Sequence, residues 1–168
     1  KIWRHILNSA GIERFPQYHF DMVRLGIGLH GISATHANLQ PVSSFKTYIS
    51  SIRNVPADQS IGYGRKSYTT RPSRIAVIPV GYADGLNRHL SNRVGNVFIK
   101  GKRVPIIGNI CMDTCMIDVT DTNATIGDEV EIFGKHILVT ELSEQLGTIP
   151  YEILTGISHR VKRVYYKE

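Results

Sequence analysis

The feature that most limits the possible folds of this 168-residue chain is a series of short apolar segments that begins near residue 45. The segments are rich in Val and Ile, and turns such as Lys100-Gly101-Lys102 and Gly134-Lys135 separate them. Many short strands at this spacing are typical of a β-barrel or a compact sandwich. The expected strands are Phe45–Val55, Arg74–Val80, Asn96–Lys100, Val104–Ile107, Cys115–Thr120, Asp128–Phe133, His136–Thr140 and Val161–Tyr166.

The first part of the chain, residues 1–32, has the pattern of an α/β protein instead. The spacing of Trp3 and Ile6 predicts a helix that ends at Gly11. Met22–Gly26 reads as a short strand that runs into a glycine-rich turn. Such a strand-to-loop junction is a common place for a phosphate group.

Two helices are also expected near the end of the chain. One covers Glu141–Leu146, with Thr140 as its capping residue and Gly147 at its end, and the other covers Tyr151–Ile157.

A polar connector from residue 33 to about residue 40 separates the two patterns. We therefore predict an α/β segment over residues 1–35 and a β domain over residues 36–168.

Composition excludes several classes of protein. Hydrophobic residues make up 42% of the chain and charged residues 20%, which is ordinary for a globular protein. No apolar run approaches the roughly 20 residues of a membrane-spanning helix, and the first residues do not resemble a signal peptide. We expect a cytoplasmic protein without a membrane partner.

The net charge of +6 raises the question of a nucleic-acid partner. The Lys and Arg residues are scattered, and only His159–Arg163 is dense, which favours a solvated surface. Cys111 and Cys115 are the two cysteines, and we expect both to be reduced, with no metal site.

Candidate site residues gather near glycines. Arg24 precedes a turn in which Gly26 and Ile27 could offer backbone N–H groups to a phosphate, although a purely structural turn is the commoner meaning. Tyr63 lies between two glycines, which leaves its ring open to a ligand. A single tyrosine in such a place more often packs its ring against the turn, with the hydroxyl in water.

Two more tyrosines lie in similar surroundings. Tyr82 is in a glycine-containing segment and Tyr151 follows Pro150. With Tyr63 they make three tyrosines near loops, which modestly favours a ligand-binding site. The segment Gly108–Asp113 interrupts the strand pattern and could expose a backbone N–H and a carboxylate, while Met112 alone is more typical of core packing.

In this order and spacing, the segments resemble alanine racemases over nearly the whole chain. The matching segments are His5–Ala10, Met22–Leu29, Gly62–Gly64, Val80–Gly85, Gly108–Asp113, Gly127–Val130, Ile149–Glu152 and Arg160–Tyr165. The resemblance implies the end of a (β/α)₈ barrel that binds pyridoxal 5′-phosphate (PLP), followed by a β domain, in a homodimer with shared active sites. The reaction implied is the interconversion of L- and D-alanine for peptidoglycan synthesis.

The same resemblance implies a role for each candidate. Arg24 would face the pyridine nitrogen of PLP and disfavour its protonation, which suppresses transamination. The phosphate would be held by Ser9, Gly26, Ile27 and Tyr151, with Asn8 beside Ser9.

Tyr63 would be one of two bases, acting in the partner's active site, and a lysine would be the other. Since free tyrosine titrates near pH ~10, a positioned network would have to draw off its proton. Met112 would bind the substrate carboxylate through its N–H, Asp113 would order the surrounding network, and Tyr82 would narrow the entrance.

The chain departs from the family pattern in three ways. His30 stands where tyrosine is usual and Asn109 where a basic residue is usual, so Asn109 could change the charge of the substrate's path. No lysine matches the Schiff-base position, which lies in the first barrel strand of the family. We therefore expect the chain alone to be inactive and to bind PLP weakly.

Four alternatives are considered. The chain could belong to a racemase of broader specificity, for serine or lysine, although Tyr151 leaves little room and favours alanine. A basic amino-acid decarboxylase shares the architecture but not the Gly81–Gly85 or Cys111–Asp113 segments. The chain could also be a non-catalytic dimerisation module. A basic module for nucleic acid predicts aromatics interleaved with Lys and Arg, but the tyrosines lie at glycine-rich loops and no such stripe appears.

Overall fold

The computed structural model describes residues 2–35 and 38–166 of the chain. It divides into two compact units, unit 1 with residues 1–44 and unit 2 with residues 45–168, and each is described by itself. The domain boundary at residue 35 stays a prediction.

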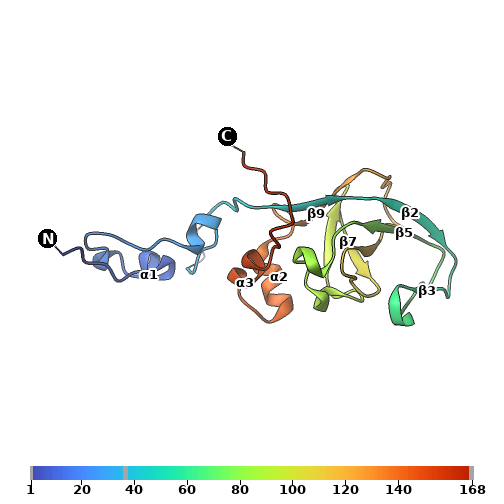
Figure 1. Ribbon diagram of the computed structural model, residues 1–168, viewed down its shortest axis with the longest axis horizontal. Helices are drawn as coiled ribbons and strands as arrows, with labels where there is room; N and C mark the ends of the chain where they lie inside the picture. Colours follow the sequence, from blue (N-terminus) through green and yellow to red (C-terminus); the bar gives the residue numbers. More distant parts are fainter. Residues whose placement is uncertain (1, 36–37, 167–168) are drawn as a thin grey trace. The chain divides into compact units, whose positions relative to one another are not determined.

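Unit 2 is built on one curved antiparallel sheet with the strand order β1-β9-β6-β7-β8-β5-β2 (Figure 1). The strands are β1 Phe45–Tyr48, β2 Ser51–Val55, β5 Ser73–Ile78, β6 Asn96–Ile99, β7 Lys102–Ile107, β8 Cys115–Asp118 and β9 Glu129–Phe133.

The sheet curls because one continuous segment supplies both of its edges. β1 pairs with β9 and β2 pairs with β5, yet only two residues separate β1 from β2. At this point the Ile49 N–H donates to Asp128 O at 3.0 Å, and the Ser50 N–H donates to Val77 O at 2.9 Å. The mainly β, barrel-like fold expected from the sequence is confirmed.

Branched aliphatic side chains fill the inside of this sheet. In β6 and β8 buried residues alternate with half-buried ones, as expected of strands with one face in a core. The side chains that are essentially inaccessible include Ile49, Ile78, Val97, Ile99, Ile106, Ile107, Ile117 and Val130. The sheet is therefore a rigid support for the loops at its ends.

A small hairpin and two helices complete unit 2. The hairpin pairs β3 (Ser60–Ile61) with β4 (Ser67–Tyr68), and between them lies the 3₁₀ turn Tyr63–Arg65. The helices are α2 (Val139–Leu146) and α3 (Pro150–Thr155). Within unit 2, β3 lies at the opposite end from α2 and α3 (Figure 1). Short 3₁₀ helices cover Tyr82–Asp84 and Arg88–Leu90.

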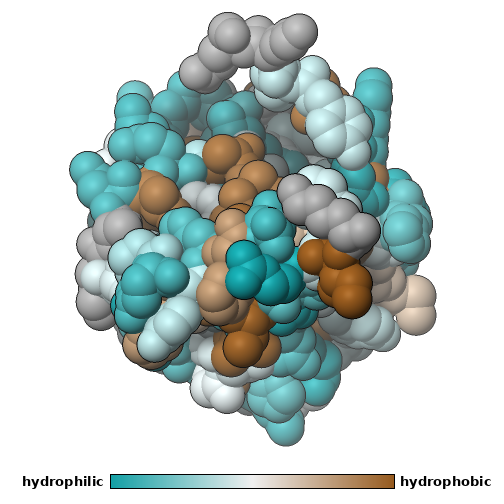
Figure 2. Space-filling model, turned by 90° about the vertical axis from the view of Figure 1, so that its left-hand side faces the viewer, coloured by the Kyte–Doolittle hydropathy of each residue, from teal (hydrophilic) through white to brown (hydrophobic). Residues whose placement is uncertain are grey.

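Unit 1 has little regular structure. It contains α1 (Ser9–Arg14) and the 3₁₀ turns Pro16–Tyr18 and Ile27–His30. Large apolar side chains are open at its surface, and Figure 2 shows brown apolar groups exposed on the face turned toward the viewer. The exposed residues are Ile2, Trp3, Ile6, Phe15, Phe20, Met22, Leu25 and Leu29.

The helix expected to end at Gly11 is wrong in position. Asn8 caps the observed helix, because its Oδ1 accepts the Gly11 N–H at 3.0 Å, and Gly11 lies inside α1. Met22–Gly26 is not a strand either. Its neighbour is the segment around Arg4 and Leu7, and two backbone hydrogen bonds join them, Asp21 N–H to Arg4 O and Arg24 N–H to Leu7 O.

Two predicted strands and a cap in unit 2 are also wrong. His136–Thr140 turns instead, since Glu131 accepts the backbone N–H groups of His136 and Ile137 and bends the chain into α2. Leu138, not Thr140, is the N-cap of α2, while Gly147 ends that helix with φ +64° as predicted. The described part of Val161–Tyr166 is not paired with any strand.

Candidate functional site

The loop of residues 108–114, between β7 and β8, lies against the segment that carries Tyr82. The Tyr82 N–H donates to Cys111 O and the Ala83 N–H donates to Met112 O, each at 3.0 Å. A Cβ added at Gly81 would lie 2.3 Å from both acceptor oxygens. Glycine at this position therefore lets the two segments approach closely enough to pair.

Arg160 joins the same two segments by charge. Its Nε donates to Asp84 Oδ1 at 2.8 Å and its Nη2 donates to Asp113 Oδ1 at 2.6 Å. Asp84 is nearly buried, and its other oxygen accepts the Gly81 N–H at 2.8 Å. Hydrogen bonds to the two carboxylates raise the pKa of Arg160 above its ordinary value, so its guanidinium stays positively charged.

The chain after α3 packs on this cluster as well. The Ser158 N–H donates to Asp84 O at 3.1 Å, and a Cβ at Gly85 would lie 2.7 Å from Gly156 O. Tyr151 lies on α3, and 46% of its surface is exposed. The helix that carries Tyr151 is thus fixed, through its C-terminal extension, to the segment of Tyr82.

Tyr63 stands on the turn of the β3–β4 hairpin, with 77% of its surface exposed. Gly62, Gly64 and Arg65 all have positive φ in this turn. The turn is fixed by Asn109, whose Nδ2 donates to Tyr63 O at 2.8 Å. The 108–114 loop therefore holds the turn of Tyr63 as well as the segment of Tyr82.

The 108–114 loop also presents groups that remain open to a ligand. Met112 is 53% exposed. Its backbone oxygen is used by Ala83, whereas its N–H has no acceptor among the residues that the structure describes. An open backbone N–H can donate to a carboxylate ligand.

In unit 1, Ser9 is the centre of a second cluster. Its side chain is buried, and its Oγ accepts the N–H of Gly26 at 2.9 Å and that of Gly28 at 3.2 Å. Within residues 2–35, no acceptor is found for the hydroxyl hydrogen itself. Ile27 follows in the chain and is buried. Asn8 serves as the helix cap, with its side chain turned to Gly11.

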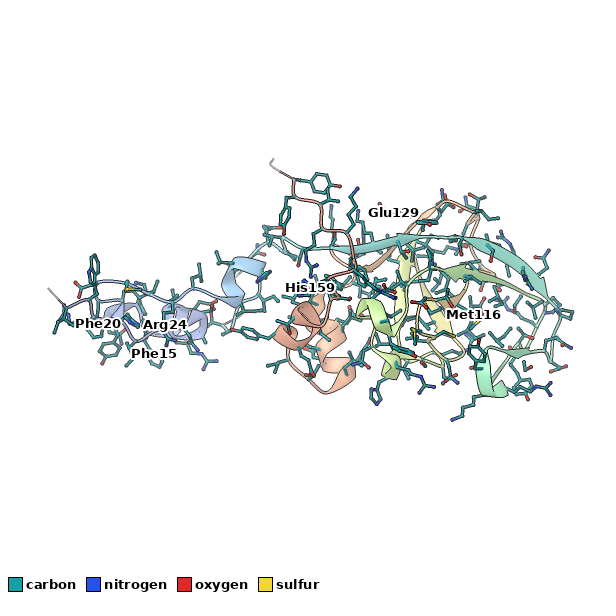
Figure 3. All side chains as sticks on the ribbon, viewed as in Figure 1. Phe15, Phe20, Arg24, Met116, Glu129 and His159 are labelled. Atoms are coloured by element: carbon teal, nitrogen blue, oxygen red, sulfur yellow. The ribbon has the colours of Figure 1, made fainter. Side chains whose placement is uncertain are left out.

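Arg24 lines an apolar groove of unit 1. Phe15, Phe20 and Arg24 are labelled together in Figure 3, and they line this groove with Ile6. The Arg24 guanidinium is exposed and donates to Ile6 O at 3.1 Å. The groove combines aromatic walls with one cation, a combination that suits a flat anionic ring.

The predicted site residues thus fall into two sets. Tyr63, Tyr82, Met112 and Asp113 are joined by the 108–114 loop of unit 2, and Tyr151 lies on the neighbouring α3. The residues Asn8, Ser9, Arg24, Gly26 and Ile27 gather in unit 1. Sequence reasoning did not find the bridging role of Arg160, since its two partners lie 76 and 47 residues away.

Other polar groups in unit 2 offer weaker candidates. One pocket is lined by four cations, each already bonded. Arg71 and Lys102 bond to Asp121, Arg93 to Asp118 and Arg103 to Glu141. Both cysteines are free thiols, and burial raises the pKa of Cys115 to about 12, which leaves that thiol unreactive.

Neither a metal nor a membrane site stands out. Across residues 2–35 and 38–166, no group of three or more His, Cys, Asp or Glu side chains is arranged to hold a metal ion. No helix in these residues is long and apolar enough to cross a membrane.

The chain is similar in sequence and in fold to known proteins. Residues 42–165 match the family described as alanine racemase, C-terminal domain. The chain is 47% identical over 172 residues to alanine racemase 2 of Caldanaerobacter subterraneus subsp. tengcongensis, covering 96% of this chain and 44% of that protein. It is 44% identical over 173 residues to alanine racemase of Methanococcus maripaludis, covering 96% of this chain and 46% of that protein.

Among solved structures, the chain is similar to alanine racemase from Bartonella henselae with covalently bound pyridoxal phosphate. The TM-score is 0.91 at 37% identity, and the match covers 99% of this chain and 47% of that chain. The chain thus spans less than half the length of the relatives that it matches.

Proposed function

The chain belongs to the alanine racemase family, and we propose that it works as the C-terminal part of a PLP-dependent enzyme that interconverts L- and D-alanine. The product D-alanine would serve peptidoglycan synthesis, in the cytoplasm. The observation that carries the proposal is the 108–114 loop, which holds the segments of Tyr63 and Tyr82 while leaving the Met112 N–H open.

The residues of unit 1 suit the cofactor. Ser9 has two N–H groups directed at its oxygen and a hydroxyl hydrogen free to donate to a phosphate. The proposed phosphate ligands are Ser9, the backbone of Gly26 and Ile27, and Tyr151, with Asn8 fixing the start of α1 beside them. Arg24 would face the pyridine nitrogen and keep it unprotonated.

What PLP supplies when bound is electron withdrawal from the amino-acid Cα, which makes its proton acidic. The residues of this chain would then move that proton and hold the substrate. Tyr63 Oη would exchange it on one face of Cα, and a lysine in the part that the relatives carry beyond this chain would do so on the other.

Substrate binding would rest on the 108–114 loop. The Met112 N–H would donate to the alanine carboxylate, and Asp113 would order that loop through Arg160. Tyr82 would narrow the entrance. Tyr151, on α3, would limit the space for a larger side chain and so favour alanine over serine or lysine.

A homodimer fits the position of the tyrosines. Tyr63 lies in the β3–β4 hairpin and Tyr151 on α3, and these elements are at opposite ends of unit 2 (Figure 1). One chain could therefore contribute Tyr151 to one active site and Tyr63 to another. Without a partner and the lysine, we expect residues 1–168 alone to show neither racemisation nor a PLP absorbance band.

The test is Tyr63→Phe in a full-length racemase that contains this chain. Removing the hydroxyl should slow Cα-proton exchange with solvent from one alanine enantiomer and leave it from the other, while racemisation falls by roughly 1,000-fold or more. Deuterium incorporation into each enantiomer, followed by NMR, measures both effects.

Tyr68→Phe is the matched control, because Tyr68 lies on β4 of the same hairpin and is likewise exposed. It should leave racemisation unchanged. Full activity of Tyr63→Phe would refute the assignment of the base. An intact dimer that turns over neither alanine, serine nor lysine would favour the non-catalytic dimerisation module instead.

A further inference from the structure

The turn that carries Tyr63 has few attachments to the rest of unit 2. The hairpin below it has two residue pairs, Ser60 with Tyr68 and Ile61 with Ser67. Within the described part of the chain, residues 62–66 form one hydrogen bond to a segment outside the hairpin, from Asn109 to Tyr63 O. The position of the Tyr63 backbone therefore depends strongly on Asn109.

Asn109 is itself held by a chain of polar groups. Its Oδ1 accepts from Asn92 Nδ2 at 3.1 Å, and Asn92 Oδ1 accepts from Ser67 Oγ at 2.8 Å. Ser67 Oγ in turn accepts the Gly108 N–H at 3.2 Å. Asn92 adds a backbone bond to Gly108 O at 2.9 Å. These bonds connect the 108–114 loop, the loop of Asn92 and the hairpin.

These bonds set a chemical requirement on the side chain at position 109. The side chain must donate to a carbonyl oxygen and at the same time accept from an amide N–H, which a short primary amide does. A carboxylate of the same shape accepts but cannot donate. A lysine or arginine donates but cannot accept.

We propose that Asn109 is a positioning residue for Tyr63, setting where the tyrosine hydroxyl stands in the active site. This inference rests on the proposed function of Tyr63. The Tyr63 hydroxyl is at the end of the side chain, far from Cα. A small rotation of the turn therefore moves the hydroxyl by more than it moves the backbone. A displacement of roughly 1 Å at a reacting group can cost about 100-fold in rate.

The decisive variant is Asn109→Asp in a full-length racemase that contains this chain, with Asn123→Asp as control. Asn123 is exposed and the control introduces the same charge. Asn109→Asp should lower kcat by about 10- to 100-fold with KM nearly unchanged, since the substrate contacts remain. Cα-proton exchange should slow for the same enantiomer that Tyr63→Phe affects.

A second measurement does not depend on activity. Amide hydrogen exchange of residues 62–66 should accelerate in Asn109→Asp, while exchange in β5 and β8 stays as in Asn123→Asp. Asn92→Asp, which removes the donor to Asn109, should give the same pattern with a smaller effect and serves if Asn109→Asp folds poorly.

Two results would overturn the inference. One is equal slowing of exchange from both enantiomers, which indicates general loss of structure. The other is an Asn109→Asp protein indistinguishable from the control in kcat and in hydrogen exchange. If the parent protein racemises nothing, the proposed function fails, and the hydrogen-exchange result still decides whether Asn109 holds the turn.

Discussion

Units 1 and 2 are parts of one chain, yet they differ in how their backbone groups are hydrogen-bonded and in how far their side chains are buried. Unit 2 closes a sheet on its own aliphatic core, and one segment provides both edge strands. Among the residues of unit 1 that the structure describes, Leu7, Ser9 and Ile27 are buried, and many large apolar side chains are exposed. Antiparallel strands can satisfy their hydrogen bonds with strands nearby in the chain, whereas a segment with a βα pattern depends on neighbouring segments to cover its apolar side chains.

The largest test of this comparison is a pair of truncations. Ile117 is fully buried in β8, and Leu29 is 62% exposed in unit 1. Ile117→Ala should lower the free energy of unfolding by about 2–5 kcal/mol because it leaves a cavity. Leu29→Ala should change it by less than about 0.5 kcal/mol. Urea unfolding measures both, and equal losses would contradict this difference between the units.

A smaller difference is expected from adding a methyl group at two glycines. Gly81→Ala would push a Cβ against the oxygens of Cys111 and Met112 and should cost about 1–3 kcal/mol. Gly11→Ala lies inside α1, where the nearest atom is Leu7 Cδ2, the movable end of a side chain, at 3.0 Å.

Because alanine favours helix over glycine by up to about 1 kcal/mol, Gly11→Ala should be neutral or mildly stabilising. Thermal unfolding of unit 2 and hydrogen exchange in α1 report the two effects separately. Destabilisation of α1 by Gly11→Ala would show that unit 1 is packed as tightly as unit 2.

The smallest expected effect is on the loss of folding stability at acid pH. Burial raises the pKa of Glu131, but hydrogen bonds from the His136 side chain and from the backbone N–H groups of His136 and Ile137 outweigh burial, so the pKa is lowered. A lowered folded-state pKa means that stability is present above the unfolded pKa of about 4.3 and is lost as the pH falls through the folded value.

Glu131→Gln should therefore flatten the acid branch of the stability curve. Glu13 in unit 1 also has a lowered pKa, through hydrogen bonds from Ser33 and Thr35, but it is not buried. Glu13→Gln should change the curve less. Urea midpoints measured from about pH 6 down to about pH 3 compare the two variants. A larger effect at Glu13 would contradict the expected difference between the units.

The sheet could be predicted from the sequence because Val and Ile alternate over short spans bounded by turn residues. The failures have local physical causes. The first helix begins after Asn8, which caps it, and so continues past Gly11. The predicted strand His136–Thr140 is a turn, because the Glu131 carboxylate accepts the backbone N–H groups of His136 and Ile137. Met22–Gly26 has the composition of a strand, but pairing partners decide whether such a segment forms one.

Candidate site residues could be named from the sequence because each lies in a motif that resembles the family. The residues that hold these site residues in position could not be named from the sequence. Arg160 reaches Asp84 and Asp113, and Asn109 depends on Asn92 and Ser67, across separations of many residues. No spacing rule connects such residues, since the fold alone brings them together. Asn109 attracted notice as a departure from the family, not as the partner of Tyr63.

The 108–114 loop has a consequence for changes in chain length. Surface loops usually accept insertions at little cost. In this loop, Asn109, Cys111 with Met112, and Asp113 each bond to a different segment. One extra residue would shift the register of these contacts, so the loop should resist lengthening as a strand in the middle of a sheet does.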